Sequence, residues 1–153
     1  MEKIIKKHAV PMLPEVIKIQ MASRGALPGQ ELQDISEAGI RDIVNKVRTG
    51  QYLSLMMVPG EENAEGYLML ESSDNLIFLQ IWDEKTRTVW ACFNPELLDS
   101  EEEFSIEHSD GQSLIPLKYT MQDRELAARC VEWYAYTCEP YPGMDWLKEN
   151  SIL

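Results

Sequence analysis

The chain has 153 residues, 44% of them hydrophobic and 26% charged, a composition typical of one globular domain with a sizeable core. Its 14 basic and 26 acidic residues give a formal net charge of −12. This charge repels phosphate backbones and anionic lipid surfaces, so it argues against direct nucleic-acid or membrane binding. It favours a basic protein partner, although acidity also serves solubility alone.

The N-terminal sequence MEKIIKKHAV has no apolar run long enough for a signal peptide, and no segment reaches the roughly 20 apolar residues of a membrane span. The three cysteines (Cys92, Cys130 and Cys138) are odd in number and share no CxxC spacing. We therefore expect free thiols in a reducing compartment. Together these features predict a cytoplasmic protein.

Residues 1–33 form a loosely assigned N-terminal segment of a single domain that spans residues 1–153. Pro11 and Pro14 would break a helix begun by EKIIKKHAV. Ile17, Ile19 and Met21 alternate with less apolar residues, as in a strand, before the loop RGALPGQELQ. The sequence leaves open whether this segment adds a strand or a helix to the core.

An amphipathic helix is predicted after Asp34. Asp34 and Glu37 have the spacing of a capping box, and Ser36 is a rival N-cap. Gly50 suits the left-handed position after the helix. The apolar residues at helical spacing are Ile40, Ile43, Val44 and Val47.

The segment Tyr52–Phe93 predicts an antiparallel meander. YLSLMMV, GYLML, NLIFLQIW and TVWACF are short apolar runs separated by polar turns. One face carries Leu53, Leu55 and Met57 on the first strand and Ile77, Leu79 and Ile81 on the third. The opposite face is also rather apolar, with Val58, Phe78, Trp82 and Trp90. Either helices cover this second face or a partner does.

An acidic stretch and a hairpin follow the meander. The acidic residues are Glu96, Asp99, Glu101, Glu102 and Glu103. FSIEH and SLIPL flank Asp110-Gly111, a strong hairpin signal. Pro116 cannot donate to a ladder, so the second strand is expected at an edge or to end there.

A second helix is predicted from Thr120, with a buried stripe of Leu126, Ala127, Cys130, Val131 and Tyr134. Pro140 and Pro142 end it. The tail MDWLKEN returns Trp146 and Leu147 to the core. The fold class is therefore α+β: a twisted antiparallel sheet of about six strands, meander plus hairpin, with two principal helices packed on it.

No catalytic, cofactor-binding or metal-ligating residue is predicted. His8 and His108 lack a partner at zinc-ligand spacing, and we expect structural or solvent-facing roles. Glu101–Glu103 read as a solvated face, as a partner-binding face or as a divalent-cation site, in that order of preference. Trp82 and Trp90 flank the DEKTR turn, either as a cross-strand aromatic pair or as a ligand platform.

The C-terminal sequence SLIPLKYTMQDRELAARCVEWYAYTCEPYPGMDW resembles the end of one family of immunity proteins, which accompany bacterial polymorphic and contact-dependent toxins. In that family a strand leads into an Ala-containing helix, a Thr-Gly-x-x-Pro turn and a tryptophan. Cys138 stands where the family has glycine, and the gap before Trp146 is longer. The resemblance covers roughly residues 34–147. The matching residues are Ala127, Ala128, Tyr134, Thr137, Pro140 and Trp146.

This resemblance implies a small protein that binds and neutralises a cognate toxin domain by covering its active surface. Charge and context, rather than the family motif, select the candidate partner-binding residues Glu101, Glu102, Glu103, Glu61, Glu62 and Trp82. The first rival is a non-enzymatic regulatory or adaptor domain that binds a protein or peptide. The second rival is an enzyme that uses scattered carboxylates. The toxin's identity, the binding face and the oligomeric state stay open.

Overall fold

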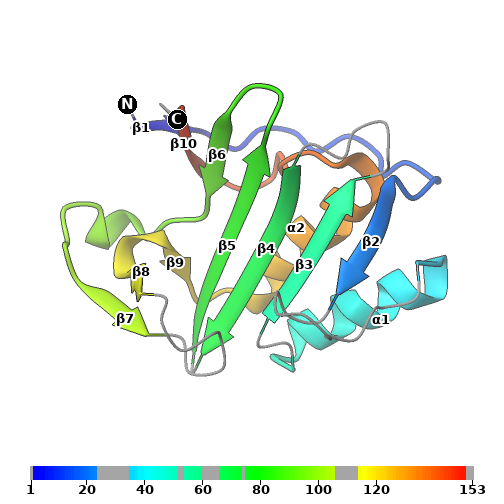
Figure 1. Ribbon diagram of the computed structural model, residues 1–153, viewed down its shortest axis with the longest axis horizontal. Coiled ribbons are helices and arrows are strands. Elements are labelled where there is room, and N and C mark those ends of the chain that lie inside the picture. Colours follow the sequence, from blue (N-terminus) through cyan, green and yellow to red (C-terminus); the bar gives the residue numbers. More distant parts are fainter. Residues whose placement is uncertain are drawn as a thin grey trace.

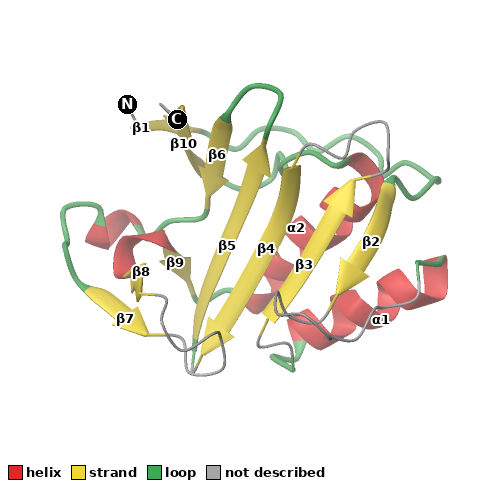
Figure 2. Cartoon of the chain, viewed as in Figure 1, coloured by secondary structure: helices red, strands yellow, loops and turns green. Residues whose placement is uncertain are grey.

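The computed structural model describes residues 2–23, 35–51, 54–59, 66–73, 75–105 and 114–150. An eight-stranded sheet carries two helices (Figures 1 and 2), which confirms the α+β prediction. The elements are β1 (Glu2–Ile5), β2 (Ile19–Ser23), α1 (Glu37–Arg48), β3 (Ser54–Pro59), β4 (Gly66–Ser73), β5 (Leu76–Asp83), β6 (Thr88–Ala91), η2 (Pro95–Leu97), β7 (Glu103–Ser105), β8 (Leu114–Pro116), η3 (Leu117–Tyr119), β9 (Thr120–Met121), α2 (Arg124–Thr137) and β10 (Trp146–Asn150).

The strand order in the large sheet is β1-β10-β6-β5-β4-β3-β2, and β9 also pairs with β5. The meander β3 to β6 is confirmed, and all the pairings among the described strands are antiparallel. The expected hairpin strands β7 and β8 do pair, but they form a separate two-stranded sheet. Pro116 ends β8, as its missing N–H requires.

One face of the meander is buried, as the alternation of apolar residues along its strands predicts. Leu55 and Met57 on β3, and Ile77, Leu79 and Ile81 on β5, are all nearly inaccessible to solvent. Leu53, predicted on the same face, lies outside the described residues. Since a strand's side chains alternate, the neighbours of these residues point to the opposite side of the sheet.

Helix α1 begins at the N-cap Ser36, whose Oγ accepts a hydrogen bond from the Gly39 N–H at 3.0 Å. The serine therefore takes the capping role, and the rival cap Asp34 lies outside the described residues. The helix ends at Thr49, and Gly50 follows with a φ of +78°, in the left-handed region that glycine tolerates. The four predicted apolar residues of α1 are buried.

Helix α2 begins at Arg124, four residues later than predicted. Asp123 is its N-cap and accepts the Leu126 N–H at 3.0 Å. Thr120 is instead fully buried in β9, where its hydroxyl donates to the Leu117 carbonyl at 2.7 Å. The prediction that the helix begins at Thr120 was wrong. Asp123, three residues later, is itself a favoured N-cap residue, and the helix begins after it.

Both helices pack on the same face of the sheet and against each other. Cys130, Val131 and Tyr134 of α2 are buried as predicted, whereas Leu126 is only half-buried. The fully buried alanines of α2 leave little side chain between this helix and its neighbours, which allows close approach. These alanines are Ala127, Ala128 and Ala135.

Besides β9, the strands β1 and β10 were not recognised in the sequence. The segments that contain them lie side by side, with Ile4 opposite Leu147 in the β1–β10 pair. The return of Trp146 and Leu147 to the core is confirmed, since they are 2% and 4% exposed. The Trp146 indole N–H donates to the Tyr141 carbonyl at 2.9 Å. Each strand is short and carries charged residues, so neither shows clear alternation.

Val131→Asp should lower the free energy of unfolding by about 3 kcal/mol or more, because it places a charge without a partner at a fully buried position. Chemical denaturation would measure this. Arg129→Asp introduces the same carboxylate on the exposed side of α2 and should keep a melting temperature near that of the wild type. Equal melting temperatures for the two variants would contradict the burial of Val131.

Cys138 ends α2 in the left-handed conformation, with a φ of 58°, and its N–H donates to the Tyr134 carbonyl at 2.8 Å. A Cβ is costly in this conformation, which glycine tolerates and which commonly follows the last residue of a helix. Cys138→Gly should therefore be more stable than Cys138→Ala by about 1 kcal/mol, since both lose the thiol and only glycine relieves the strain. A more stable alanine variant in denaturant titrations would refute this explanation.

Candidate partner-binding face

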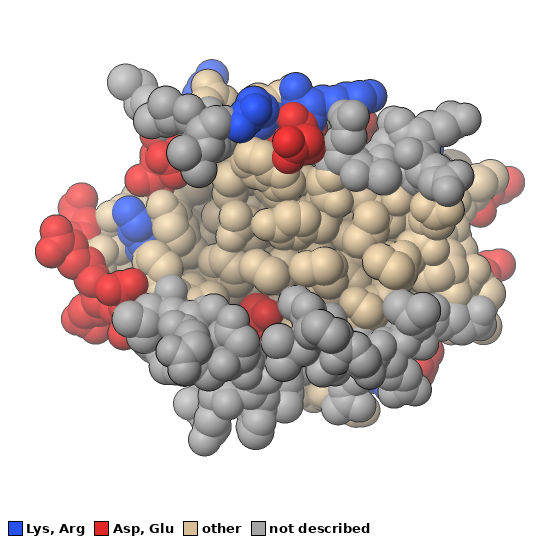
Figure 3. Space-filling view, in the orientation of Figure 1, with Lys and Arg blue, Asp and Glu red and all other residues tan. Residues whose placement is uncertain are grey.

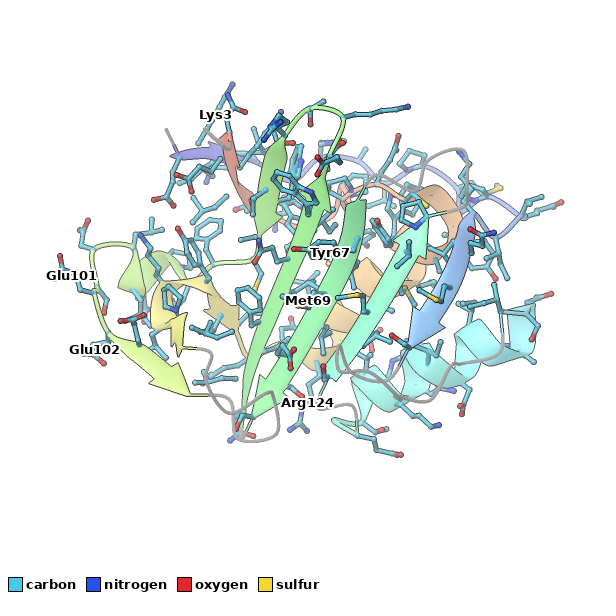
Figure 4. The ribbon with its side chains drawn as sticks, in the orientation of Figure 1. Lys3, Tyr67, Met69, Glu101, Glu102 and Arg124 are labelled. Carbon is cyan, nitrogen blue, oxygen red and sulfur yellow. The ribbon has the colours of Figure 1, made fainter. Side chains whose placement is uncertain are left out.

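The face of the sheet opposite the helices is apolar and open. The strand registers place Met56 on β3, Met69 on β4 and Gln80 on β5 in one row across it, and all three are partly exposed. Figure 3 shows uncharged surface over these central strands, and Figure 4 shows Tyr67 and Met69 on β4. We call this surface the open face. Its further members are Met21, Val58, Tyr67 and Trp82.

Exposed apolar side chains stand at both ends of the open face. Met21 on β2 is 41% exposed and pairs with Val58, and Ile4 on β1 is 40% exposed and pairs with Leu147. Neither α1 nor α2 covers the surface between them, although Ile115 of β8 and Tyr119 of η3 pack over Phe78, which is 6% exposed, on the same face. The partly exposed apolar side chains that remain, grouped on β3, β4 and β5, are typical of a protein-binding site. Of the two alternatives left by the sequence, helices or a partner, the described helices do not take this face.

Trp82 lies on the open face, and Trp90 does not. Trp82 is paired with Tyr67 on one side and with Val89 on the other, while Trp90 is paired with Ile81. The two tryptophans therefore point to opposite faces, and the predicted cross-strand aromatic pair was wrong by one residue of register. The Trp82 indole N–H donates to the Glu84 carboxylate, which leaves the ring partly exposed.

The predicted acidic residues border the open face on the side of β7. Glu101, Glu102 and Glu103 are all exposed, and the first two lie at the left edge of Figure 4, where acidic side chains also gather in Figure 3. The backbone is held, because the Glu102 carbonyl accepts the Leu117 N–H at 2.8 Å. None of the three carboxylates forms an ion pair with a residue that the structure describes.

Glu61 and Glu62, the other acidic candidates, lie outside the described residues. The structure therefore brings Trp82 onto the open face and the Glu101–Glu103 run beside it, while the position of the remaining pair is not described. We call Glu101, Glu102 and Glu103 the acidic edge.

A small depression marks the end of the open face formed by β5, β6, β10 and β1. It measures about 210 Å³, and its walls include Val89, Ala91 and Leu147. Glu2 and Glu149, which also line it, stand opposite each other in the β1–β10 pair. Apolar walls beneath paired carboxylates suit the stem and charged head of a lysine or arginine side chain.

One of these carboxylates is already engaged. Glu2 accepts the Tyr119 hydroxyl at 3.2 Å and lies 3.5 Å from the Lys118 ammonium. Burial, together with this carboxylate, raises the pKa of Tyr119, so the phenol stays protonated. Sequence reasoning missed this depression because Glu2 and Glu149 are brought together only by the unrecognised pairing of β1 with β10.

Of the two histidines, the structure describes His8. His8 is exposed and is held by its backbone, whose N–H donates to the Pro142 carbonyl at 2.8 Å. His108 lies outside the described residues. Within the part of the chain that the structure describes, no group of three or more His, Cys, Asp or Glu residues is placed to hold a metal ion.

The three cysteines are free thiols. Burial raises the pKa of Cys92 to about 12 and that of Cys138 to about 11, and it raises the pKa of Cys130 well above its usual value. Desolvation disfavours the thiolate, which is the nucleophilic form. The Cys92 thiol instead donates to the Tyr119 carbonyl at 3.3 Å. These cysteines are therefore packing residues at neutral pH.

Comparison of the chain with protein-family models, with curated proteins and with solved structures finds no match in any of the three. Among the described residues, no helix combines the length and the apolar character needed to cross a membrane.

Alkylation at pH 8 should be slow for all three thiols in the native protein, because each has a raised pKa and two are buried. In denaturant, without reductant, three thiols should react, as mass spectrometry would show. Unfolding returns each pKa to about 8.5, so these groups favour folding below that pH and lose their contribution as the pH rises towards 11 and 12. A native thiol alkylated at the denatured rate would contradict this.

Proposed function

We propose that this chain is an immunity protein that binds a cognate bacterial toxin domain and neutralises it by covering its active surface. The observation that carries the proposal is the open face, an exposed apolar sheet surface bordered by the acidic edge. The resemblance of residues 34–147 to an immunity family supports the same assignment. The toxin would be a basic protein, and one that acts on nucleic acid has the required positive surface.

The open face supplies what a protein interface needs at its centre. Tyr67 and Trp82 are large side chains with few rotatable bonds, and Met69 is a large side chain that can adapt its shape to a partner. Each of the three lies partly exposed on a rigid strand. Aromatic and methionine side chains are enriched in interface cores. Because the sheet is packed on two helices from behind, the face would accept a partner with little rearrangement.

The acidic edge supplies steering. Three adjacent exposed carboxylates attract a basic surface over a distance set by ionic strength, and they lie beside the apolar centre rather than within it. The depression between Glu2 and Glu149 could receive one basic side chain of the toxin. Charge at the rim and apolar groups at the centre is the usual arrangement of a specific interface.

The net charge favours a basic partner over a second copy of the chain. Two copies, each carrying −12, would repel one another when their acidic edges approached. A regulatory or adaptor domain that binds a basic peptide is the remaining alternative. The effect on the partner distinguishes this alternative from an immunity protein, because only an immunity protein protects a cell that makes the toxin.

The protein encoded by the neighbouring reading frame should arrest bacterial growth when expressed alone, and co-expression of this chain should restore growth. Reversal of the acidic edge (Glu101, Glu102 and Glu103 to lysine) should slow association with that protein by about tenfold or more at low salt, with a smaller effect at high salt. Stopped-flow kinetics would measure both.

The matched control reverses three exposed acidic residues elsewhere, namely Glu15, Glu37 and Asp42. This control changes the net charge by the same amount, so any difference in association rate between the two variants is due to the position of the reversed charges. Tyr67→Ala should instead speed dissociation, weakening binding by about tenfold or more. Growth arrest that this chain cannot relieve would overturn the proposal, and equal association rates for both triple variants would remove the acidic edge from it.

A further inference from the structure

A second feature lies on the helix side of the sheet. Its lining shares Trp82 with the open face, but its other side chains have no part in the proposed function. A cavity of about 550 Å³ lies where the C-terminal end of α2 meets β5, β6 and the N-terminal segment. Its size is within the range of small-molecule sites. The lining residues used below are Lys6, Lys18, Lys85, Trp90, Tyr134 and Cys138.

The walls of this cavity are fixed by backbone hydrogen bonds. The His8 N–H donates to the Pro142 carbonyl at 2.8 Å, which ties the N-terminal segment to the turn after α2. The Lys18 N–H donates to the Ala135 carbonyl at 2.9 Å, and so occupies a carbonyl of the last helical turn. The cavity is thus a built feature of the fold rather than a gap between loosely placed segments.

Cations gather around the cavity although the chain as a whole is strongly acidic. Lys18 and Lys85 form no ion pair with any described residue, and Lys6 is 3.8 Å from its single described partner, Asp145. Basic side chains are also visible along the top of Figure 3, near the β5–β6 turn. Unpaired lysines at a concave site favour an anionic ligand.

The acidic residues of the lining are Asp83 and Glu139. One carboxylate oxygen of Asp83 accepts the backbone N–H groups of Lys85 and Thr86, at 3.0 and 3.4 Å, so this residue serves the turn. Of the three lysines, Lys6 has Asp145 as its partner, so Lys18 and Lys85 are the two cations of the lining without a described ion-pair partner.

Aromatic side chains provide the other half of the site. Trp90, on the helix side of the sheet, carries the Lys148 ammonium 4.8 Å from its ring centroid, which adds a further cation beside this wall. Burial raises the pKa of Tyr134, so its hydroxyl is protonated and can donate a hydrogen bond. Burial likewise raises the pKa of Cys138 to about 11 and keeps that thiol neutral.

We propose that this cavity binds a small anion that carries a flat ring, such as a nucleoside monophosphate. Lys6, Lys18 and Lys85 would hold the anionic group, and the ring would pack on the aromatic wall that includes Trp90. The net charge of −12 disfavours a nucleic-acid polymer, whose many phosphates lie outside the cavity, but it affects a single small anion far less.

Isothermal titration calorimetry with adenosine monophosphate should show saturable binding at one site per chain. The double variant Lys18→Glu with Lys85→Glu should weaken this binding by about tenfold or more, because two attractive charges become repulsive. The double variant Arg41→Glu with Lys46→Glu makes the same change in net charge on α1, outside the cavity lining, and should bind as the wild type does. Melting temperatures would confirm that the variants are folded.

Further ligands separate the two halves of the site. Adenosine, which lacks the anion, and inorganic phosphate, which lacks the ring, should each bind more weakly than adenosine monophosphate. An aromatic carboxylate that binds equally well would support the ring-bearing class and identify the carboxylate as its natural anion. Absence of saturable binding by both ring-bearing anions at millimolar concentration, or an undiminished affinity in the double variant, would overturn the proposal, whatever the fate of the immunity assignment.

Discussion

The packing of both helices on one face of the sheet is the constraint on which the rest of the structure depends. Buried alanines allow α2 to lie close to α1, and the two helices together cover the face that carries Leu55, Leu79 and Ile81. Burial of that face supplies the main stabilising term of the domain. Neither α1 nor α2 is then left for the other face, where Ile115 and Tyr119 pack on Phe78 while Met56, Tyr67 and Met69 stay partly exposed to water.

The charge distribution follows the same division of the molecule. The acidic edge lies at the β7 side of the open face, whereas several lysines lie near the cavity at the end of α2. A chain with a large net charge can therefore present two local environments of opposite sign. A basic macromolecule and a small anion would be attracted to different places, with Trp82 between them as a residue of both surfaces.

The meander, the stripe of α1 and the buried side of α2 could be read from the sequence because each has a clear period of two or about 3.6. The β1–β10 pair could not, since EKII and WLKEN are short and their alternation is obscured by charges. The predicted pairing of Trp82 with Trp90 was wrong because the length of a turn decides the register of the two strands. A shift of one residue in register places Trp90 on the other face of the sheet. The depression and the cavity are assembled from distant segments, which no local pattern reveals.

The pairing of β1 with β10 has a consequence for how the chain folds. Glu2 of β1 stands opposite Glu149 of β10, so β1 cannot pair until the chain has been made as far as β10. Until then β6 lacks its neighbour β10, and an unpaired edge of an apolar sheet is open to association with other chains. Contacts so distant along the chain are slow to form. Closure of this edge is therefore a late event, and a chain cut before residue 146 would be expected to aggregate.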